Sequence, residues 1–105
     1  MDKITVLVVD DHPVFRQGLR DILRQEHDIE VVGEGADGQQ ALELVRRLQP
    51  DIVILDINLP NLNGLQVTRQ LRSERSPSAV IMLTAYDDQE QVLHAFRAGC
   101  SAYCS

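Results

Sequence analysis

The chain has 105 residues, with a hydrophobic fraction of 44% and a charged fraction of 25%, which are ordinary values for one globular domain. Its formal net charge of -6 and scattered basic residues argue against DNA or RNA binding by the chain itself, because phosphate binding relies on clustered Lys and Arg. No apolar run approaches the ~20 residues that cross a bilayer, and the N-terminus does not resemble a signal peptide. We therefore expect a cytoplasmic protein without membrane contact.

The first part of the chain is typical of strand, helix and strand in succession. Residues 4–9 form an apolar run with one Thr, as expected of a strand buried on both faces. Pro13 favours the start of a helix. Residues 30–34 carry charge at both ends, which indicates a strand at an edge of the sheet. The apolar positions of the first helix recur at helical spacing: Val14, Phe15, Leu19, Ile22 and Leu23.

The alternation continues to the end of the chain. A second helix follows the turn Asp37-Gly38 and ends before Pro50. Residues 52–55 and 80–83 are two more apolar strands, separated by a loop and a third helix. A fourth helix is expected to end with Gly99 at its C′ position, before a short fifth strand at 102–104. The helical apolar positions are Leu65, Val67, Thr68 and Leu71 in the third helix, and Val92, Leu93 and Phe96 in the fourth.

This alternation predicts an α/β fold with a parallel sheet and right-handed crossovers. The apolar runs at 4–9, 52–55 and 80–83 belong in the centre of the sheet, and the polar or short runs belong at its edges. The strand order 2-1-3-4-5 meets this condition, and it is the flavodoxin-like, doubly wound order. Ligands then bind beyond the carboxyl ends of the first and third strands. The carboxylates that follow these two strands, and that should share one crevice, are Asp10, Asp11 and Asp56.

Three carboxylates in one crevice repel one another. Two unit charges ~4 Å apart at an effective dielectric constant of about 20 repel by roughly 4 kcal/mol. Either some of the pKa values rise or a divalent cation lies among the carboxylates. An all-oxygen, partly hydrated site suits Mg²⁺ or Mn²⁺ better than Zn²⁺. A carboxylate beside such an ion can attack phosphorus and form an aspartyl phosphate.

Three motifs, VVDDHPVFRQGL, DIVILDINLPNLNGL and IMLTAY, follow successive strands. Together they resemble the receiver domain of two-component response regulators, in particular the NarL/LuxR subfamily, over the whole chain. The resemblance implies a phosphoacceptor regulatory domain rather than an enzyme, at most self-phosphorylating and self-dephosphorylating with Mg²⁺. It also implies a sensor histidine kinase as partner, a homodimer, and DNA contact only through an output domain that this chain does not carry.

The resemblance assigns a role to each residue that matches a motif. Asp56 matches the phosphoacceptor. Asp10 and Asp11 match the acidic pair that binds Mg²⁺, with Asp11 the favoured direct ligand. Asn58 would supply its backbone carbonyl to the ion. The remaining matches are Thr84 for the hydroxyl that bonds a phosphoryl oxygen, Tyr103 for the aromatic switch residue, and Pro60 and Gly64 for the loop after the acceptor, with Gly64 opening the third helix.

The end of the chain departs from the family pattern. Receivers carry a Lys directly after the fifth strand, which here is the position after Ser105, where the sequence ends. The expected domain therefore spans residues 1–105 and is truncated before the fifth helix, so the first helix alone would cover its face of the sheet. We expect the phosphoryl site to lack one charge partner.

Alternatives remain open for several features. A phosphatase of the haloacid dehalogenase kind would need a D-x-D motif where this chain has Asp-Asp-His, and a flavodoxin would need a phosphate-binding loop there. Asp11 could also cap the helix that begins near Pro13. His12 is interpreted as a partly exposed neighbour of the site without a catalytic role. Other side chains have structural interpretations: Cys100 and Cys104 as packed thiols, and Arg69, Arg72 and Arg75 as a solvated face.

Overall fold

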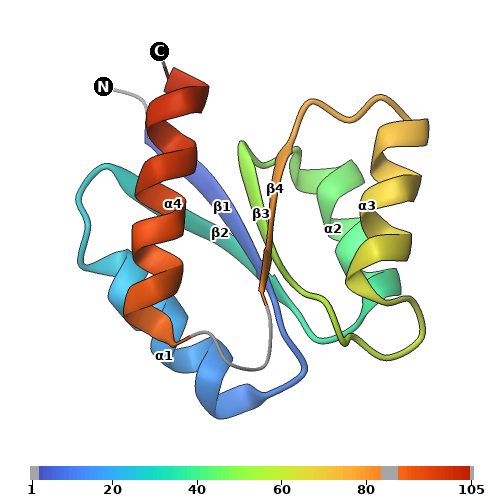
Figure 1. The fold of residues 1–105 in the computed structure, drawn as a ribbon, viewed down its shortest axis with the longest axis horizontal. Helices are drawn as coiled ribbons and strands as arrows, with labels where there is room; N and C mark the ends of the chain where they lie inside the picture. Colours follow the sequence, from blue (N-terminus) through green and yellow to red (C-terminus); the bar gives the residue numbers. More distant parts are fainter. Residues whose placement is uncertain (1–2, 84–87, 105) are drawn as a thin grey trace.

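The computed structural model describes residues 3–83 and 88–104. Within these residues strands and helices alternate around one parallel sheet of order β2-β1-β3-β4 (Figure 1). None of the described helices combines the length and the apolar character needed to cross a bilayer. The elements are β1 (Ile4–Val9), α1 (Pro13–Arg24), β2 (Ile29–Gly35), α2 (Gly38–Leu48), β3 (Ile52–Asp56), α3 (Gly64–Ser73), β4 (Ala79–Leu83) and α4 (Gln89–Cys104).

The sheet separates two hydrophobic clusters, as the apolar strands predict. Along β1, Val6 and Val8 join a cluster with α1 and α4, whereas Leu7 and Val9 join a cluster with α2 and α3. This alternation follows from the two-residue period of a strand. All five residues of β3 are buried. The prediction of central strands is confirmed for β1 and β3, but β4 lies at an edge of the described sheet.

Helix starts follow local sequence signals. Pro13 occupies the first turn of α1, as predicted. The Asp37 carboxylate caps α2 by accepting from the Gln40 backbone N–H at 2.8 Å. Asn63 and Gln66 form a reciprocal capping box at the start of α3. These caps fix where α2 and α3 begin, and with them the loop that follows β3.

The predicted fifth strand is wrong. Residues 102–104 continue α4, and Gly99 lies inside that helix rather than ending it. A three-residue strand offers few ladder hydrogen bonds, whereas a helix satisfies the same backbone groups locally. A helical Gly costs only about 1 kcal/mol relative to Ala, so it does not force an end. The described sheet matches the first four positions of the predicted order, and Cys100 and Cys104 lie on the helix.

The prediction that α1 alone covers its face is also wrong, because α4 lies beside α1 on the same side of the sheet (Figure 1). Val92 and Phe96 bury almost completely there. The Arg97 guanidinium donates to Asp28 at 2.7 Å and to Glu26 at 2.8 Å, and it lowers the pKa of Asp28. Burial and these ion pairs hold α4 against the α1–β2 connection.

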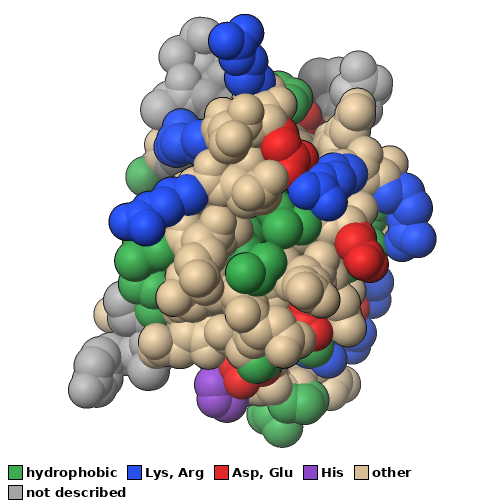
Figure 2. All heavy atoms as spheres, turned by 90° about the vertical axis from the view of Figure 1, so that its right-hand side faces the viewer, with side chains coloured by type: hydrophobic (Ala, Val, Ile, Leu, Met, Phe, Trp, Pro, Cys, Tyr) green, Lys and Arg blue, Asp and Glu red, His purple; other side chains and the backbone are tan. Residues whose placement is uncertain are grey.

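The surface of the opposite layer is mixed in charge. On the face formed by α2 and α3, basic side chains are interspersed with acidic and uncharged ones (Figure 2). Arg69, Arg72 and Arg75 are all exposed, as expected of a solvated surface. One helical position was misassigned from its spacing, because Val14 is 84% exposed at the start of α1.

Candidate functional site

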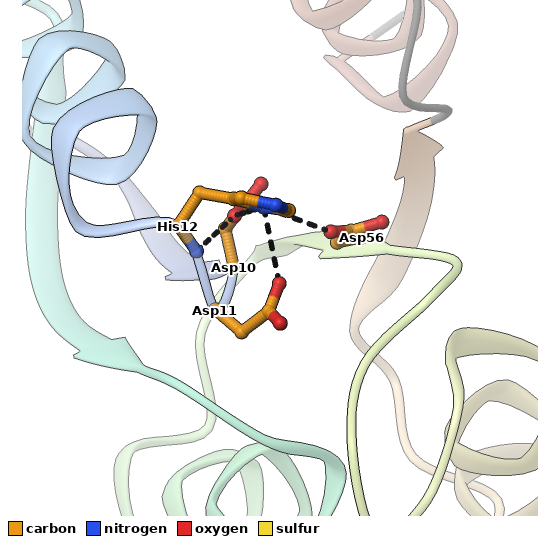
Figure 3. A group of neighbouring side chains, drawn as sticks. All are labelled: Asp10, Asp11, His12 and Asp56. Atoms are coloured by element: carbon orange, nitrogen blue, oxygen red, sulfur yellow. Dashed lines mark hydrogen bonds and ion pairs between the residues drawn. The ribbon is translucent and has the colours of Figure 1, made fainter.

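Asp10 and Asp56 meet at the carboxyl ends of two neighbouring strands (Figure 3). The parallel register pairs Val9 of β1 with Leu55 of β3, so the next residue of each strand reaches the same edge of the sheet. Asp10 is 4% exposed and Asp56 is 6% exposed. Two carboxylates therefore stand at the end of an apolar sheet, as the strand order predicts.

The backbone around Asp56 is held by three hydrogen bonds. The Asn58 N–H donates to Asp56 Oδ1 at 3.0 Å. The Ile57 N–H donates to the Leu83 carbonyl at 3.0 Å, and the Gly64 N–H donates to the Ile57 carbonyl at 3.0 Å. The end of β3 is thus tied both to β4 and to the first residue of α3. Gly64 opens the third helix, as predicted.

Asp11 and His12 complete the cluster. The Asp11 side chain is 35% exposed and the His12 ring is 71% exposed. His12 Nδ1 lies 3.0 Å from Asp10 Oδ1, 3.1 Å from Asp11 Oδ1 and 3.8 Å from Asp56 Oδ2 (Figure 3). The hydrogen bond with Asp10, then the charges of Asp11 and Asp10, raise the pKa of His12. The imidazole, interpreted from sequence as a neighbour without a role, faces all three carboxylates.

The start of α1 settles one open alternative. The N-cap residue is His12, and no side chain caps this helix by a hydrogen bond. The cap role considered for Asp11 is therefore wrong. The Asp11 carboxylate instead faces the cluster, where its oxygen lies close to the imidazole.

The predicted electrostatic conflict is visible at Asp56. Burial raises the pKa of its carboxyl group above the ordinary value, and the charges of Asp10 and Asp11 raise it further. The Asn58 N–H and the His12 ring act in the opposite direction. Burial and the neighbouring carboxylates therefore disfavour the charged form of Asp56.

The four side chains fit a divalent cation. One ligand atom each from Asp10, Asp11, His12 and Asp56 lies within 4.8 Å of the others. Ligands around a small cation with bonds of about 2.1 Å are separated by about 3 to 4 Å, so a small inward movement of these side chains would bring the cluster to that size. Three carboxylates supply the oxygen donors that Mg²⁺ and Mn²⁺ prefer.

Arg16 supports the cluster from α1, and the sequence reasoning missed it. Its guanidinium donates to the Asp10 backbone carbonyl at 2.7 Å and lies 3.3 Å from Glu34 on β2. Arg20 donates to the same Glu34 at 2.9 Å. The spacing of Arg16 and Arg20 on one helix face, opposite an acidic residue of the edge strand, is the signal that indicates this support.

The structure brings together Asp10, Asp11 and Asp56 as the sequence predicts. The Asn58 backbone contacts Asp56 through its N–H, while the predicted role of its carbonyl stays a prediction. Thr84 lies outside the described residues. Tyr103 lies on α4 rather than on a strand, and its side chain is outside the described part of the structure.

Comparison with known proteins agrees with this geometry. Residues 6–105 match the response regulator receiver domain. The chain belongs to this family. The receiver is 40% identical over 102 residues to the transcriptional regulatory protein DegU of Brevibacillus brevis, covering 97% of this chain and 43% of that protein. It is 35% identical over 99 residues to the nitrate/nitrite response regulator protein NarL of Escherichia coli K12, covering 94% of this chain and 46% of that protein.

The fold comparison gives the same family. The signal receiver domain of the response regulator NarL from Mycobacterium tuberculosis superposes with a TM-score of 0.80 at 38% identity, covering 92% of this chain and 78% of that one. The chain is thus a receiver domain of NarL/LuxR type, and it spans less than half the length of the two curated relatives named above. Family membership decides for the receiver over the phosphatase and flavodoxin interpretations.

Proposed function

We propose that this receiver accepts a phosphoryl group on Asp56 from a sensor histidine kinase and thereby controls a DNA-binding transcriptional output in the cytoplasm. The observation that supports this most is the position of the Asp56 carboxylate, buried at the end of β3 and clustered with Asp10 and Asp11. Family membership supports the same role, because receivers are regulatory phosphoacceptor domains with an acidic pocket for Mg²⁺.

The proposed transfer begins with attack by a carboxylate oxygen. One of the two carboxylate oxygens of Asp56 attacks phosphorus, and Oδ1 accepts from the Asn58 N–H. The P–O bond forms as the P–N bond to the kinase imidazole breaks, and the electron pair of that bond stays on the leaving nitrogen. Asp10, Asp11, Asp56 and the Asn58 carbonyl would hold Mg²⁺ or Mn²⁺. The bound cation would neutralise charge on the phosphoryl oxygens.

The response to phosphorylation is proposed from the resemblance. The Thr84 hydroxyl would bond a phosphoryl oxygen, and Tyr103 would respond as the aromatic partner of Thr84. A homodimer is the proposed assembly of the phosphorylated form. The Thr84 assignment rests on the IMLTAY motif, and those of Tyr103 and the homodimer rest on the resemblance to the family.

The test is chemical phosphorylation. The protein is incubated with acetyl phosphate and Mg²⁺ and analysed by intact mass and peptide mapping, with beryllofluoride binding followed by NMR in parallel. One phosphoryl group is expected on the wild type and none on Asp56→Asn. Asp21→Asn is the matched control, because Asp21 is an exposed carboxylate on α1. A longer version of the chain is run beside it. An adduct that persists in Asp56→Asn, or no adduct on either wild-type length, contradicts the proposal.

A further inference from the structure

His12 places a nitrogen donor where the three carboxylates converge. Its ring lies across the mouth of the cluster, with Nδ1 directed at Asp10, Asp11 and Asp56 (Figure 3). The other two histidines of the chain, His27 and His94, are exposed and lie outside this cluster. The site therefore has one imidazole, and its Nδ1 points to the same region that the three carboxylate groups surround.

The backbone of His12 is fixed on both sides. Pro13 restricts the preceding residue to extended conformations, and His12 has φ -97° and ψ 104°. Its N–H donates to Asp10 Oδ1 at 2.7 Å, and its carbonyl accepts from the Arg16 N–H at 2.9 Å. These contacts anchor the backbone of His12 beside the carboxylates, although the ring is exposed. Such anchoring reduces the ordering needed when a ligand binds.

The distances match coordination of a small cation. Nδ1 lies 3.0, 3.1 and 3.8 Å from one oxygen each of Asp10, Asp11 and Asp56. Around an octahedral ion with bonds of about 2.1 Å, adjacent ligands are about 3 Å apart and opposite ligands about 4 Å. A cation shared with the carboxylates would therefore lie within reach of Nδ1 after little movement of the ring.

We propose that His12 is a metal-selectivity residue, whose Nδ1 joins the carboxylates as a ligand and raises the preference of the site for first-row transition ions over Mg²⁺. Imidazole is a good ligand for cobalt, nickel, zinc and copper ions, whereas Mg²⁺ favours oxygen. The inference rests on the proposed function, because it concerns the same cation site. It adds a nitrogen ligand and a choice of metal to that site.

The experiment measures Co²⁺ and Mg²⁺ affinity by calorimetry on wild type and His12→Ala, with His27→Ala and His94→Ala as matched controls. Removing an outer-shell partner of a metal ligand typically costs about 10–100-fold in affinity, and loss of a direct ligand should cost at least about tenfold. We expect His12→Ala to weaken Co²⁺ binding by at least that factor and to leave Mg²⁺ affinity within about twofold. The controls should behave as the wild type.

Spectroscopy identifies the ligand independently of affinity. Cu²⁺ bound to the wild type should show nitrogen hyperfine coupling in electron paramagnetic resonance, and His12→Ala should lose it. An equal loss of Co²⁺ and Mg²⁺ affinity, tighter binding of both in His12→Ala, or coupling that persists in the variant overturns the inference.

The two proposals fail separately. If Asp56 forms an adduct in the presence of Mg²⁺ but Cu²⁺ shows no nitrogen coupling, the proposed role of His12 is wrong and the proposed phosphoacceptor stands. If His12 gives nitrogen coupling but the protein forms no adduct, the proposed phosphoacceptor is wrong and the proposed metal site stands.

Discussion

Gly64 begins α3 directly against the peptide group that follows Asp56. A Cβ atom at this position would lie 2.8 Å from the Asp56 carbonyl oxygen and 2.9 Å from the Ile57 Cα. Both are backbone atoms, so neither can rotate away. None of the described glycines has a positive φ, so the requirement for Gly here is space rather than backbone conformation.

Gly64→Ala should therefore lower the free energy of unfolding by about 1–3 kcal/mol, as overpacking typically does. Urea denaturation followed by circular dichroism measures this. The matched control is Gly35→Ala, because a Cβ there would meet only side-chain atoms at 3.4 to 3.6 Å. That variant should stay within about 1 kcal/mol of the wild type. Equal destabilisation of the two variants would contradict the spatial argument.

Residue-level reasoning from the sequence identified the carboxylates and placed His12 beside them, but it did not predict the contacts that His12 and Arg16 make. Asp10, Asp11 and Asp56 were predictable because parallel strands of known order end at one edge. His12 was expected as a partly exposed neighbour of the site, but the direction of its ring was not predictable, because it depends on how Pro13 and the Asp10 hydrogen bond turn the chain. Arg16 was also missed. Its spacing from Arg20 indicates that both guanidinium groups face Glu34, but no sequence pattern marks the hydrogen bond from Arg16 to the Asp10 backbone carbonyl.

At the scale of elements, Arg46 and Glu74 connect α2 to the end of α3. The Arg46 Nε–H donates to Glu74 Oε1 at 2.9 Å, and the Gln70 amide donates to Glu74 Oε2 at 2.8 Å. The Arg46 hydrogen bond, followed by that of Gln70, lowers the pKa of Glu74 from 4.5 to about 2. The pair is exposed, so its effect on stability is small and screened by salt.

Glu74→Gln gives a pH-dependent prediction. Because the folded-state pKa of Glu74 is lowered, its stabilisation is present above its unfolded pKa of 4.5 and is lost as the pH falls towards about 2. The melting temperature of Glu74→Gln should lie below that of the wild type at neutral pH, and the two should converge across this range. Glu30→Gln, which removes an exposed carboxylate on β2, is the matched control for removing a negative charge. A melting-temperature difference that stays constant down to pH 2 would contradict the assignment.

Element prediction succeeded where length and composition agreed. Residues 4–9 and 52–55 are apolar apart from one Thr, are flanked by charged residues, and form the central strands β1 and β3. The expectation for 102–104 was wrong because three residues have no measurable period, and a short apolar segment fits a helix as well as a strand. Whether such a segment forms a helix or a strand depends on its pairing partner and on its packing, and neither can be read from the segment's own residues.

At the scale of the whole molecule, the two hydrophobic clusters are joined through the sheet. Successive residues of β1 and β3 point to opposite faces, so each strand contributes side chains to both clusters. Loss of packing on one face therefore weakens the strands that support the other. We expect one cooperative unfolding transition for both layers.

Phe96→Ala, on the α1–α4 face, and Leu71→Ala, on the α2–α3 face, test this coupling. Both side chains are buried. Phe96→Ala should lower the free energy of unfolding by about 3–5 kcal/mol, and Leu71→Ala should lower it by about 2–5 kcal/mol. Each variant should still show one transition, at a lower urea midpoint, by circular dichroism and by NMR probes in both layers. Val14→Ala is the control. Its free energy of unfolding should stay within about 0.5 kcal/mol of the wild type, because the Val14 side chain is 84% exposed. A variant in which one layer unfolds before the other would contradict the coupling.

Ile57 is a junction between three parts of the molecule. Its N–H is bonded to the last residue of β4, and its carbonyl is bonded to the first residue of α3. It also follows Asp56 directly, so there is no flexible segment between the carboxylate and these two elements. A displacement of the Asp56 backbone is therefore a displacement of Leu83 and Gly64 as well. Through this one residue, a charge added to the side chain of Asp56 would reach both a strand and a helix.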